Sequence, residues 1–319
     1  MPEVHAILSA SSSKRWLNCT PSARLEQNFP NESSVYAEEG TAAHALGEYK
    51  LRKYLHERVK RPTSEYEDEE MEANTDIYAE FIISTVERIK ETCPHPLVMV
   101  EERLDYSYLV PSGFGTGDCV IIADGTLYVM DYKNGKGVFV NCDHNPQMML
   151  YALGAYHAYG YLYSIKKVSM TIIQPRLENI STFECSVEEL LDWAETYVRP
   201  RAKLDFEGKG EQVPGDWCRF CRARTSCKAC AAEAMALVKE EFLDLDAGVL
   251  EEETEETDAT ASFDPDTSVP TFKSPALLSK TDIEKMLPTL NRIESWIEAI
   301  FAYVSSEAIN HGVSWDGYK

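Results

Sequence analysis

Four segments of the chain concentrate apolar residues over the length of a β-strand. They are "PLVMVEERL" (96–104), "DCVIIA" (118–123), "TLYVMDYK" (126–133) and "KVSMTIIQ" (167–174). Short runs rich in Val, Ile and aromatic residues are typical of strands. Asp124-Gly125 separates the second run from the third, and this dipeptide favours a two-residue turn because both of its positions need a positive φ. We therefore expect a β-hairpin over 118–133.

Helical patterns surround these strands. Apolar residues at helical spacing occur over 40–60, with Thr41 as the expected N-cap, and a second helix is expected over 75–90. The segment 145–163, "NPQMMLYALGAYHAYGYLY", has the length and composition of a buried amphipathic helix. This order of elements predicts an α/β fold with a mixed central β-sheet flanked by helices.

The character of the chain changes after about residue 240. Residues 241–277 are acidic, rich in Thr and poor in apolar periodicity, which predicts a flexible linker. Within 278–319, apolar residues from Ile283 to Val304 recur every three or four positions, which predicts a helical segment. Residues 1–240 are expected to form the main domain.

Charge is distributed unevenly. The formal net charge of −22 argues against a nucleic-acid partner, because phosphate binding needs cations. Segments 65–72 and 240–266 hold 18 of those excess negative charges, so local basic patches can still exist elsewhere. One is "KLRKYLHERVKR" (50–61), which is either a DNA-guiding surface or a solvated helix face.

The sequence predicts a cytoplasmic protein with no membrane partner. It contains no run of 18 apolar residues, and its first residues, "MPEVHAILSA", lack the basic and apolar regions of a signal peptide. The nine cysteines are odd in number and unevenly placed. Metal binding or ordinary burial therefore explains them better than disulfides do.

The hairpin carries two acids at its open end. Counting back from the turn places Asp118 directly across from Asp131, where two like charges destabilise a sheet. Strand alternation puts Lys133 on the same face as both acids. A Mg²⁺ ion would neutralise the pair and place the lysine beside metal-bound water, as phosphodiester hydrolysis requires. The alternative is a solvent-exposed sheet end, where Lys133 is a simple counter-ion.

The same residues resemble a known family. "GTGD" (115–118), followed after twelve residues by "DYK" (131–133), resembles the core of the PD-(D/E)XK phosphodiesterase superfamily, and its surroundings are similar to the RecB-like exonuclease branch. The resemblance covers about residues 8–232. It implies a restriction-endonuclease-like core. Gly117 stands where the family name has its proline.

Four further residues match that branch in order. His44 in "GTAAHALGE" resembles its helical metal-binding histidine, and Glu101 in "VEERL" resembles the glutamate on the strand before the hairpin. Gln147 and Tyr151 match its "QxxxY" helix, and their spacing places them on one helix face. Glu102 adjoins Glu101, so strand parity decides which of the two faces the site.

The resemblance implies a role for each matching residue. Asp118, Asp131, His44 and the carbonyl of Tyr132 would hold Mg²⁺ or Mn²⁺. Lys133 would be the catalytic lysine. Glu101 would belong to the same site, and Gln147 and Tyr151 would contact the substrate or brace the lysine.

A cysteine cluster, "WCRFCRARTSCKAC", supplies Cys218, Cys221, Cys227 and Cys230. Four local thiolates could bind structural Zn²⁺, or three of them and a distant cysteine could bind a [4Fe–4S] cluster. In the resembling branch one cysteine precedes the nuclease core and three follow it, and Cys19 stands where the first is expected. The resemblance thus implies a cluster on Cys19, Cys218, Cys221 and Cys227, joining the N- and C-terminal segments of the fold and leaving Cys230 outside.

These features together predict a Mg²⁺- or Mn²⁺-dependent DNA exonuclease. The settings of the resembling family suggest phage or prophage recombination and repair, with a single-strand annealing protein as a partner. Two alternatives stay open: a non-catalytic DNA-binding or assembly module built on an iron–sulfur or zinc scaffold, and a structure- or sequence-specific endonuclease. The sequence leaves the oligomeric state open.

Overall fold

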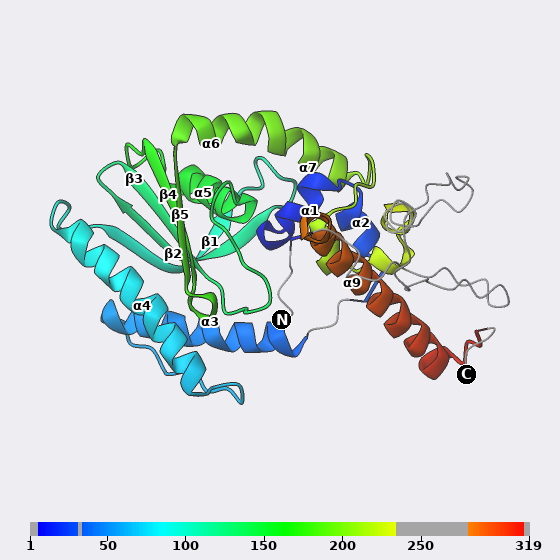
Figure 1. Cartoon of the computed structure of the whole chain (residues 1–319). Helices are drawn as coiled ribbons and strands as arrows, with labels where there is room; N and C mark the ends of the chain where they lie inside the picture. Colours follow the sequence, from blue (N-terminus) through cyan, green and yellow to red (C-terminus); the bar gives the residue numbers. More distant parts are fainter. Residues whose placement is uncertain (1–5, 31–33, 234–279, 316–319) are drawn as a thin grey trace, which may run out of the picture. The chain divides into compact units, whose positions relative to one another are not determined.

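The computed structural model describes residues 6–30, 34–233 and 280–315 (Figure 1). The chain divides into two compact units, Met1–Gln212 and Val213–Lys319. The predicted linker, 241–277, lies outside the described residues.

A five-stranded sheet forms the centre of the first unit, as the sequence predicts. Its order is β1-β2-β3-β4-β5, and all neighbours are antiparallel except β3 and β4, which are parallel. The sheet is therefore mixed. Its strands are β1 (Leu97–Asp105), β2 (Phe114–Ala123), β3 (Thr126–Tyr132), β4 (Lys167–Gln174) and β5 (Asn179–Ser186).

The β2–β3 hairpin forms in the predicted register. Asp124 and Gly125 adopt φ values of 48° and 71°, as a two-residue turn of this kind requires. Ala123 faces Thr126, and the paired residues run from there to Cys119 opposite Met130. Asp118 and Asp131 are the next residues beyond the Cys119–Met130 pair, one on each strand.

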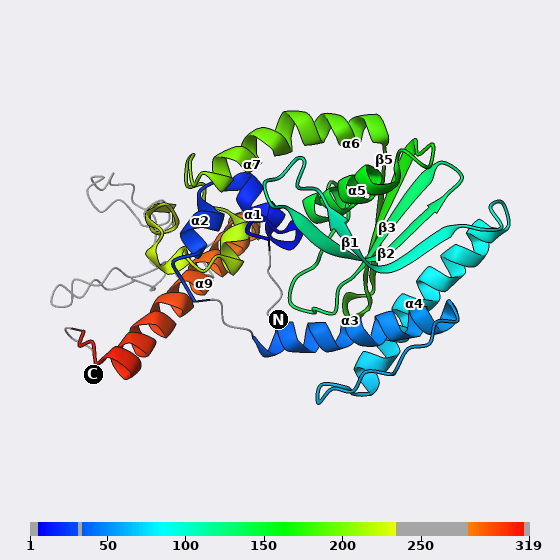
Figure 2. The ribbon, with the colours of Figure 1, turned by 180° about the vertical axis from the view of Figure 1, so that it is seen from behind.

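Helices cover both faces of the sheet (Figures 1 and 2). On one face α3 (Val35–Tyr54) and α4 (Glu69–Lys90) pack together. On the other lies α5 (Pro146–Tyr159), the helix that connects β3 to the parallel β4. The predicted α/β fold is confirmed.

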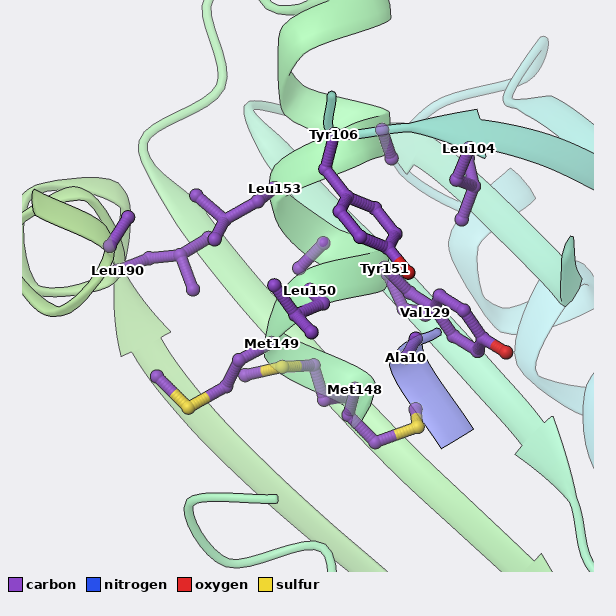
Figure 3. Close-up of a cluster of buried hydrophobic side chains, with 14 of the residues drawn as sticks. Ala10, Leu104, Tyr106, Val129, Met148, Met149, Leu150, Tyr151, Leu153 and Leu190 are labelled. Atoms are coloured by element: carbon purple, nitrogen blue, oxygen red, sulfur yellow. The ribbon is translucent and has the colours of Figure 1, made fainter. Parts of the chain in front are cut away.

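Alternation along the hairpin separates two cores. Val120 and Ile122 belong to the core under α5, whereas Cys119 and Ile121 belong to the core under α3 and α4. Figure 3 shows the α5 core, where side chains of this helix meet those of β1 and β3. The labelled residues are Ala10, Leu104, Tyr106, Val129, Met148, Met149, Leu150, Tyr151, Leu153 and Leu190.

The two helices on the α3–α4 face begin earlier than predicted. Ser34, not Thr41, is the N-cap of α3, and its hydroxyl accepts from the backbone N of Ala37 at 3.2 Å. Thr41 lies inside the helix and donates to the carbonyl of Ala37. The prediction was wrong because the first turn of α3 is exposed, so apolar periodicity does not reveal it.

The acidic segment 65–72 contains the beginning of α4. Asp68 caps this helix through Met71 N at 2.7 Å, and Glu69, Glu70 and Glu72 occupy the first turn. Carboxylates there interact favourably with the helix dipole. Part of the excess negative charge therefore stabilises a helix end.

β5 and the helical segment that follows it were not predicted. β5 alternates exposed residues with half-buried ones at the edge of the sheet, so its sequence lacks an apolar run. It leads into α6 (Val187–Trp193), a π-helical turn (Ala194–Val198) and α7 (Arg199–Phe206). Ser186 caps α6 through a capping box with Glu189. This local signal was present in the sequence.

The second unit contains short turns and one long helix. Residues Asp216–Phe220 and Arg224–Ser226 form 3₁₀ turns, and α9 spans Lys280–His311. The predicted C-terminal helix is thus confirmed. No helix in the described part of the chain has the length and apolar character needed to cross a bilayer.

Asp205 generates a prediction about stability. This α7 residue is fully buried, and burial raises the pKa of its carboxyl to about 8, with the Ala23 backbone and the Arg15 charge opposing the shift. A carboxyl whose pKa rises on folding stabilises the folded state at low pH, and that contribution declines as pH increases from about 4 to 8. We expect Asp205→Asn to raise the melting temperature at pH 8.5 more than at pH 5. Equal shifts at both pH values would contradict this account.

Candidate active site

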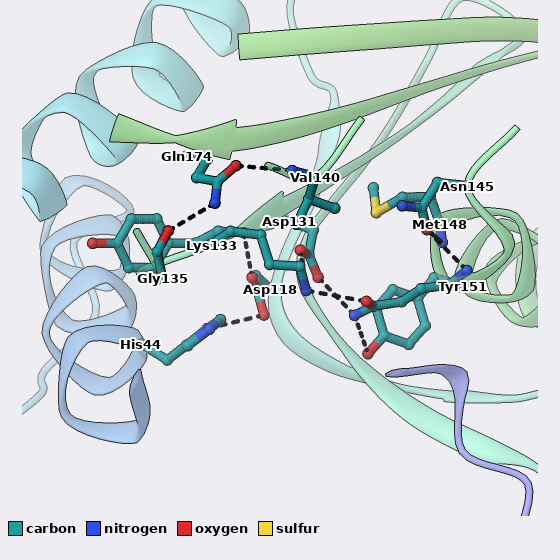
Figure 4. A network of polar contacts seen from close by, with 12 residues as sticks. His44, Asp118, Asp131, Lys133, Gly135, Val140, Asn145, Met148, Tyr151 and Gln174 are labelled. Atoms are coloured by element: carbon teal, nitrogen blue, oxygen red, sulfur yellow. Dashed lines mark hydrogen bonds and ion pairs between the residues drawn. The ribbon is translucent and has the colours of Figure 1, made fainter. Parts of the chain in front are cut away.

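Asp118 and Asp131 occupy the buried end of the hairpin, not a solvent-exposed sheet end. They are only 6% and 2% exposed, although each carries a carboxyl group. Burying like-charged carboxylates is costly unless other groups compensate them. The site is built from those compensating groups (Figure 4).

Asp118 is held from two sides. Its Oδ2 accepts from the backbone N of Tyr132 at 2.6 Å, and its Oδ1 lies 3.3 Å from Nδ1 of His44 on α3. Burial alone would raise the pKa of Asp118, but the charge and hydrogen bond of His44 outweigh it and lower that pKa. Burial likewise opposes protonation of His44, yet Asp118 raises the pKa of the imidazole to about 9.

Asp131 is held by Lys133 and Gln147. Nζ of Lys133 lies 2.7 Å from Asp131 Oδ2, and Nε2 of Gln147 donates to Oδ1 at 3.1 Å. Burial raises the pKa of Asp131, the Lys133 charge opposes that rise, and the nearby Asp118 adds to it. The pKa values of the two aspartates are therefore shifted in opposite directions, a pattern found where acids take different roles.

Gln147 fixes the position of the lysine. Its Oε1 accepts from Lys133 Nζ at 3.1 Å, and its Nε2 also donates to the hydroxyl of Tyr151 at 3.2 Å. Gln147 and Tyr151 lie on one face of α5, as predicted, and Asn145 caps the helix through Gln147 N at 3.0 Å. The residues matched to "QxxxY" thus brace Lys133 and Asp131.

Glu101 enters the site through a distortion of β1. Val100 pairs with Cys119 and Glu102 pairs with Gly117, and between them Glu101 has φ 53°, a strained value for a residue with a side chain. Burial raises the pKa of its carboxyl to about 7, assisted by Asp118. Glu102 instead accepts from the hydroxyl of Tyr159 at 2.7 Å. The assignment that the sequence left between the two glutamates therefore falls to Glu101.

His44, Glu101 and Asp118 form a group suited to a metal ion. One ligand atom from each lies within 4.8 Å of the others. Carboxylate donors suit Mg²⁺ and Mn²⁺, whereas an imidazole donor favours a transition metal over Mg²⁺. Such a cation would also offset the cost of burying these carboxylates together. The group contains the predicted ligands His44 and Asp118, whereas the predicted ligand Asp131 lies outside it and pairs with Lys133.

Tyr132 reaches the site through its backbone. Its N–H points to Asp118 on β2, and in an extended strand the carbonyl of the same residue faces the same neighbour. Its predicted role as a carbonyl ligand is consistent with this direction. Its side chain also matters, because the ring lies edge-on to His44 with centroids 5.4 Å apart.

Gly115 is a site residue that motif reasoning passed over. A Cβ at this position would lie 2.5 Å from Cε1 of Tyr151, so only glycine lets the tyrosine ring pack against β2. The signal was in the "GTGD" segment, where Gly115 begins the motif. Its role follows from contact with Tyr151 of α5, which lies 36 residues later in the sequence.

Comparison with known proteins places the chain in a family. The model of DUF2800, described as "Protein of unknown function (DUF2800)", matches residues 5–319. The chain belongs to the DUF2800 family. A solved structure titled "Crystal structure of SSO0001" is 15% identical, with 66% of this chain and 95% of that chain covered and a TM-score of 0.24. A TM-score this low supports no statement about fold or function.

The cysteines of this DUF2800 chain lie in both units. Cys19 is buried at the end of α1 (Ser13–Asn18) in the first unit. The other four predicted candidates lie in the second unit and are half-buried: Cys218, Cys221, Cys227 and Cys230.

The thiol of Cys230 is not isolated from its neighbours. It shares a hydrogen bond with Cys218, which raises the pKa of Cys230 well above its usual range, with burial and the charges of the other thiols adding to the shift. Cys230, which the resemblance leaves outside the cluster, therefore lies near the predicted ligands. Cys19 as the fourth ligand stays a prediction.

Three of the six lysines and arginines in the basic segment 50–61 form ion pairs. Lys50 forms ion pairs with Glu72 and Asp76, and Arg61 forms ion pairs with Glu67 and Glu72. Arg52 is paired with acids nearby in its own sequence. Much of the positive charge therefore holds α3, α4 and the loop between them together, and the acidic segment is its partner.

The neighbouring glutamates of β1 offer a matched test of the metal site. Glu101→Gln should weaken Mn²⁺ binding roughly 100-fold or more, because losing a direct ligand costs more than losing an outer hydrogen bond, itself worth about 10–100-fold. Glu102→Gln should leave the affinity unchanged. Isothermal titration calorimetry measures both, and equal affinities for the two variants would exclude Glu101 as a ligand.

Metal analysis tests the cysteine predictions. We expect anaerobically purified protein to be brown and to contain about four irons per chain. Cys19→Ser should then lose iron, whereas Cys230→Ser should retain it. Colourless protein with one zinc, retained in Cys19→Ser and lost in Cys230→Ser, would establish the four-thiolate zinc alternative.

Proposed function

We propose that the chain is a Mg²⁺- or Mn²⁺-dependent DNA exonuclease that hydrolyses phosphodiester bonds. The observation that carries this proposal is the position of Lys133, whose ammonium is held by Asp131 and Gln147 next to the His44, Glu101 and Asp118 group. The choice of DNA and of exonucleolytic cleavage comes from the resemblance of "GTGD" and "DYK" to RecB-like nucleases. Phage or prophage recombination, with an annealing protein as partner, is the setting proposed from the same resemblance.

The residues divide the work between them. The ion would be held by His44, Glu101, Asp118 and the Tyr132 carbonyl. Asp131 would be a further ligand from β3. A divalent cation bound there polarises a phosphate and lowers the pKa of bound water. Asp131 and Gln147 restrict the Lys133 side chain, so its ammonium is already positioned to stabilise charge that develops on the phosphate.

Substrate would have to approach through the side of the site that solvent reaches. His44 and Lys133 retain side-chain exposures of 34% and 24%, whereas Asp118 and Asp131 are almost fully covered. Lys133 is the partly accessible group that can meet a phosphate, whereas His44 and the covered carboxylates would hold the cation. This division supports hydrolysis at the site more than simple structural ion pairing.

Lys133→Ala tests the chemistry. Removing a positioned charge from a developing anion typically costs about 10²–10³-fold in rate, so we expect a loss of that size in Mn²⁺-dependent degradation of linear DNA. Binding of Mn²⁺ should persist, because the lysine is not a ligand. Lys167→Ala is the matched control, since Lys167 is an exposed lysine paired with Glu184 at the first residue of β4.

Two outcomes would redirect the proposal. Degradation of closed circular DNA would indicate an endonuclease, because an exonuclease needs a strand end. Unaltered protein that binds DNA but degrades none with either ion would indicate the non-catalytic binding module.

A further inference from the structure

Arg176 connects three segments that approach the site from different parts of the chain. It lies in the turn Pro175–Leu177 between β4 and β5, and its side chain is 11% exposed. Nη1 donates to Glu39 Oε1 at 2.6 Å, while Nε and Nη2 donate to the two carboxylate oxygens of Glu70 at 3.0 and 2.9 Å. Nη1 also lies 3.4 Å from the carbonyl oxygen of Asn134.

The partners of Arg176 belong to elements that build the site. Glu39 lies five residues before His44 on α3, and Asn134 directly follows Lys133. The Asn134 side chain donates to Glu39 Oε1 at 3.2 Å and accepts from the Tyr132 hydroxyl at 3.1 Å. These contacts join the guanidinium to both sides of the candidate active site.

Tyr132 links this network to the metal group. Its hydroxyl bonds Asn134, its ring lies edge-on to His44, and its backbone N holds Asp118. A displacement of α3 along the sheet would disturb the ring contact with His44 and the bond from Asn134 to Glu39. The position of His44 relative to Asp118 therefore depends on what holds α3 in register with β3.

Apolar packing alone does not fix that register. Ala43, Leu46 and Leu51 of α3 pack on the sheet and on α4, but such contacts are non-directional and permit sliding. Charge-assisted hydrogen bonds from a planar guanidinium are short and directional. Arg176 supplies them at the end of α3 that leads to His44.

We infer that Arg176 is a positioning residue that holds α3 so that His44 faces Asp118 and Glu101. This inference rests on the proposed metal-dependent function. Arg176 touches neither the metal group nor Lys133 directly, and it acts through Glu39, Asn134 and Tyr132. Removing the Arg176 side chain is expected to weaken cation binding at the site.

The measurement is the affinity of the full chain for Mn²⁺ by isothermal titration calorimetry. Arg176→Gln should weaken binding by about 10-fold, the lower end of the effect of losing a group bonded directly to a metal ligand, because Arg176 contacts no ligand itself. Arg176→Lys should restore only part of the affinity, because lysine keeps the charge but lacks the fork that bonds Glu39 and Glu70 together. Arg199→Gln, which removes an exposed pair with Glu195, should change nothing.

The two glutamates provide a matched pair that separates positioning from general stability. Glu39→Ala removes the connection to α3, whereas Glu70→Ala removes the connection to α4 and leaves the α3 connection intact. We expect Glu39→Ala to weaken Mn²⁺ binding clearly more than Glu70→Ala does. Hydrogen exchange in residues 35–46 should increase in Glu39→Ala and Arg176→Gln, reporting a loosened α3 without any metal present.

Other results would overturn the inference. If Arg176→Gln binds Mn²⁺ as the unaltered protein does, even with a lower melting temperature, the role is structural only and the proposed function is unaffected. If Glu39→Ala and Glu70→Ala weaken Mn²⁺ binding equally, Arg176 likewise has only a structural role. If the unaltered protein binds no Mn²⁺, the metal site fails, and the inference fails with it.

Discussion

The site depends on two carboxylates that a tight turn brings to the same end of one hairpin. Asp124-Gly125 sets the register of β2 against β3, and that register leaves Asp118 and Asp131 adjacent at the end of the ladder. Their burial makes the arrangement unfavourable unless positive charge and donors surround it. His44, Lys133, Gln147 and the Tyr132 amide meet that requirement from three different elements.

The electrostatics of the two acids differ because their partners differ. Asp118 faces the imidazole of His44, a contact that lowers the pKa of the carboxyl and raises that of the imidazole to about 9. Asp131 and the side-chain amide of Gln147 both contact Lys133, and burial raises the pKa of Asp131. Neighbouring carboxyl groups with opposite pKa shifts, and a third acid on a strained β1 residue, are features found at functional sites.

Charge elsewhere in the first unit is used for assembly. The acidic run at the start of α4 pairs with Lys50 and Arg61 and, through Glu70, with Arg176. These pairs leave the net charge of −22 unchanged, because that value already counts both partners of each pair. The same pairing removes much of segment 50–61 as a source of free positive charge.

The sequence by itself determined the features that depend on local rules. The turn residues specified the hairpin register, strand alternation placed Lys133 with the acids, and helical spacing placed Gln147 four residues before Tyr151. β5 and the α6–α7 segment were not predicted, because an edge strand and short helices with half-buried faces give weak periodic signals. Ser34 was missed as the cap of α3 because the first turn of that helix is exposed.

Only the tertiary structure decided how distant residues meet. It selected Glu101 over Glu102 through a backbone distortion that no propensity predicts, and it explained Gly115 by the approach of Tyr151. It also brought Arg176 into contact with Glu70 and Glu39, which lie 106 and 137 residues away in the sequence. Such contacts are set by the packing of helices on the sheet. The sequence could not predict them, because a local pattern of apolar and polar residues does not say which distant segments that packing brings together.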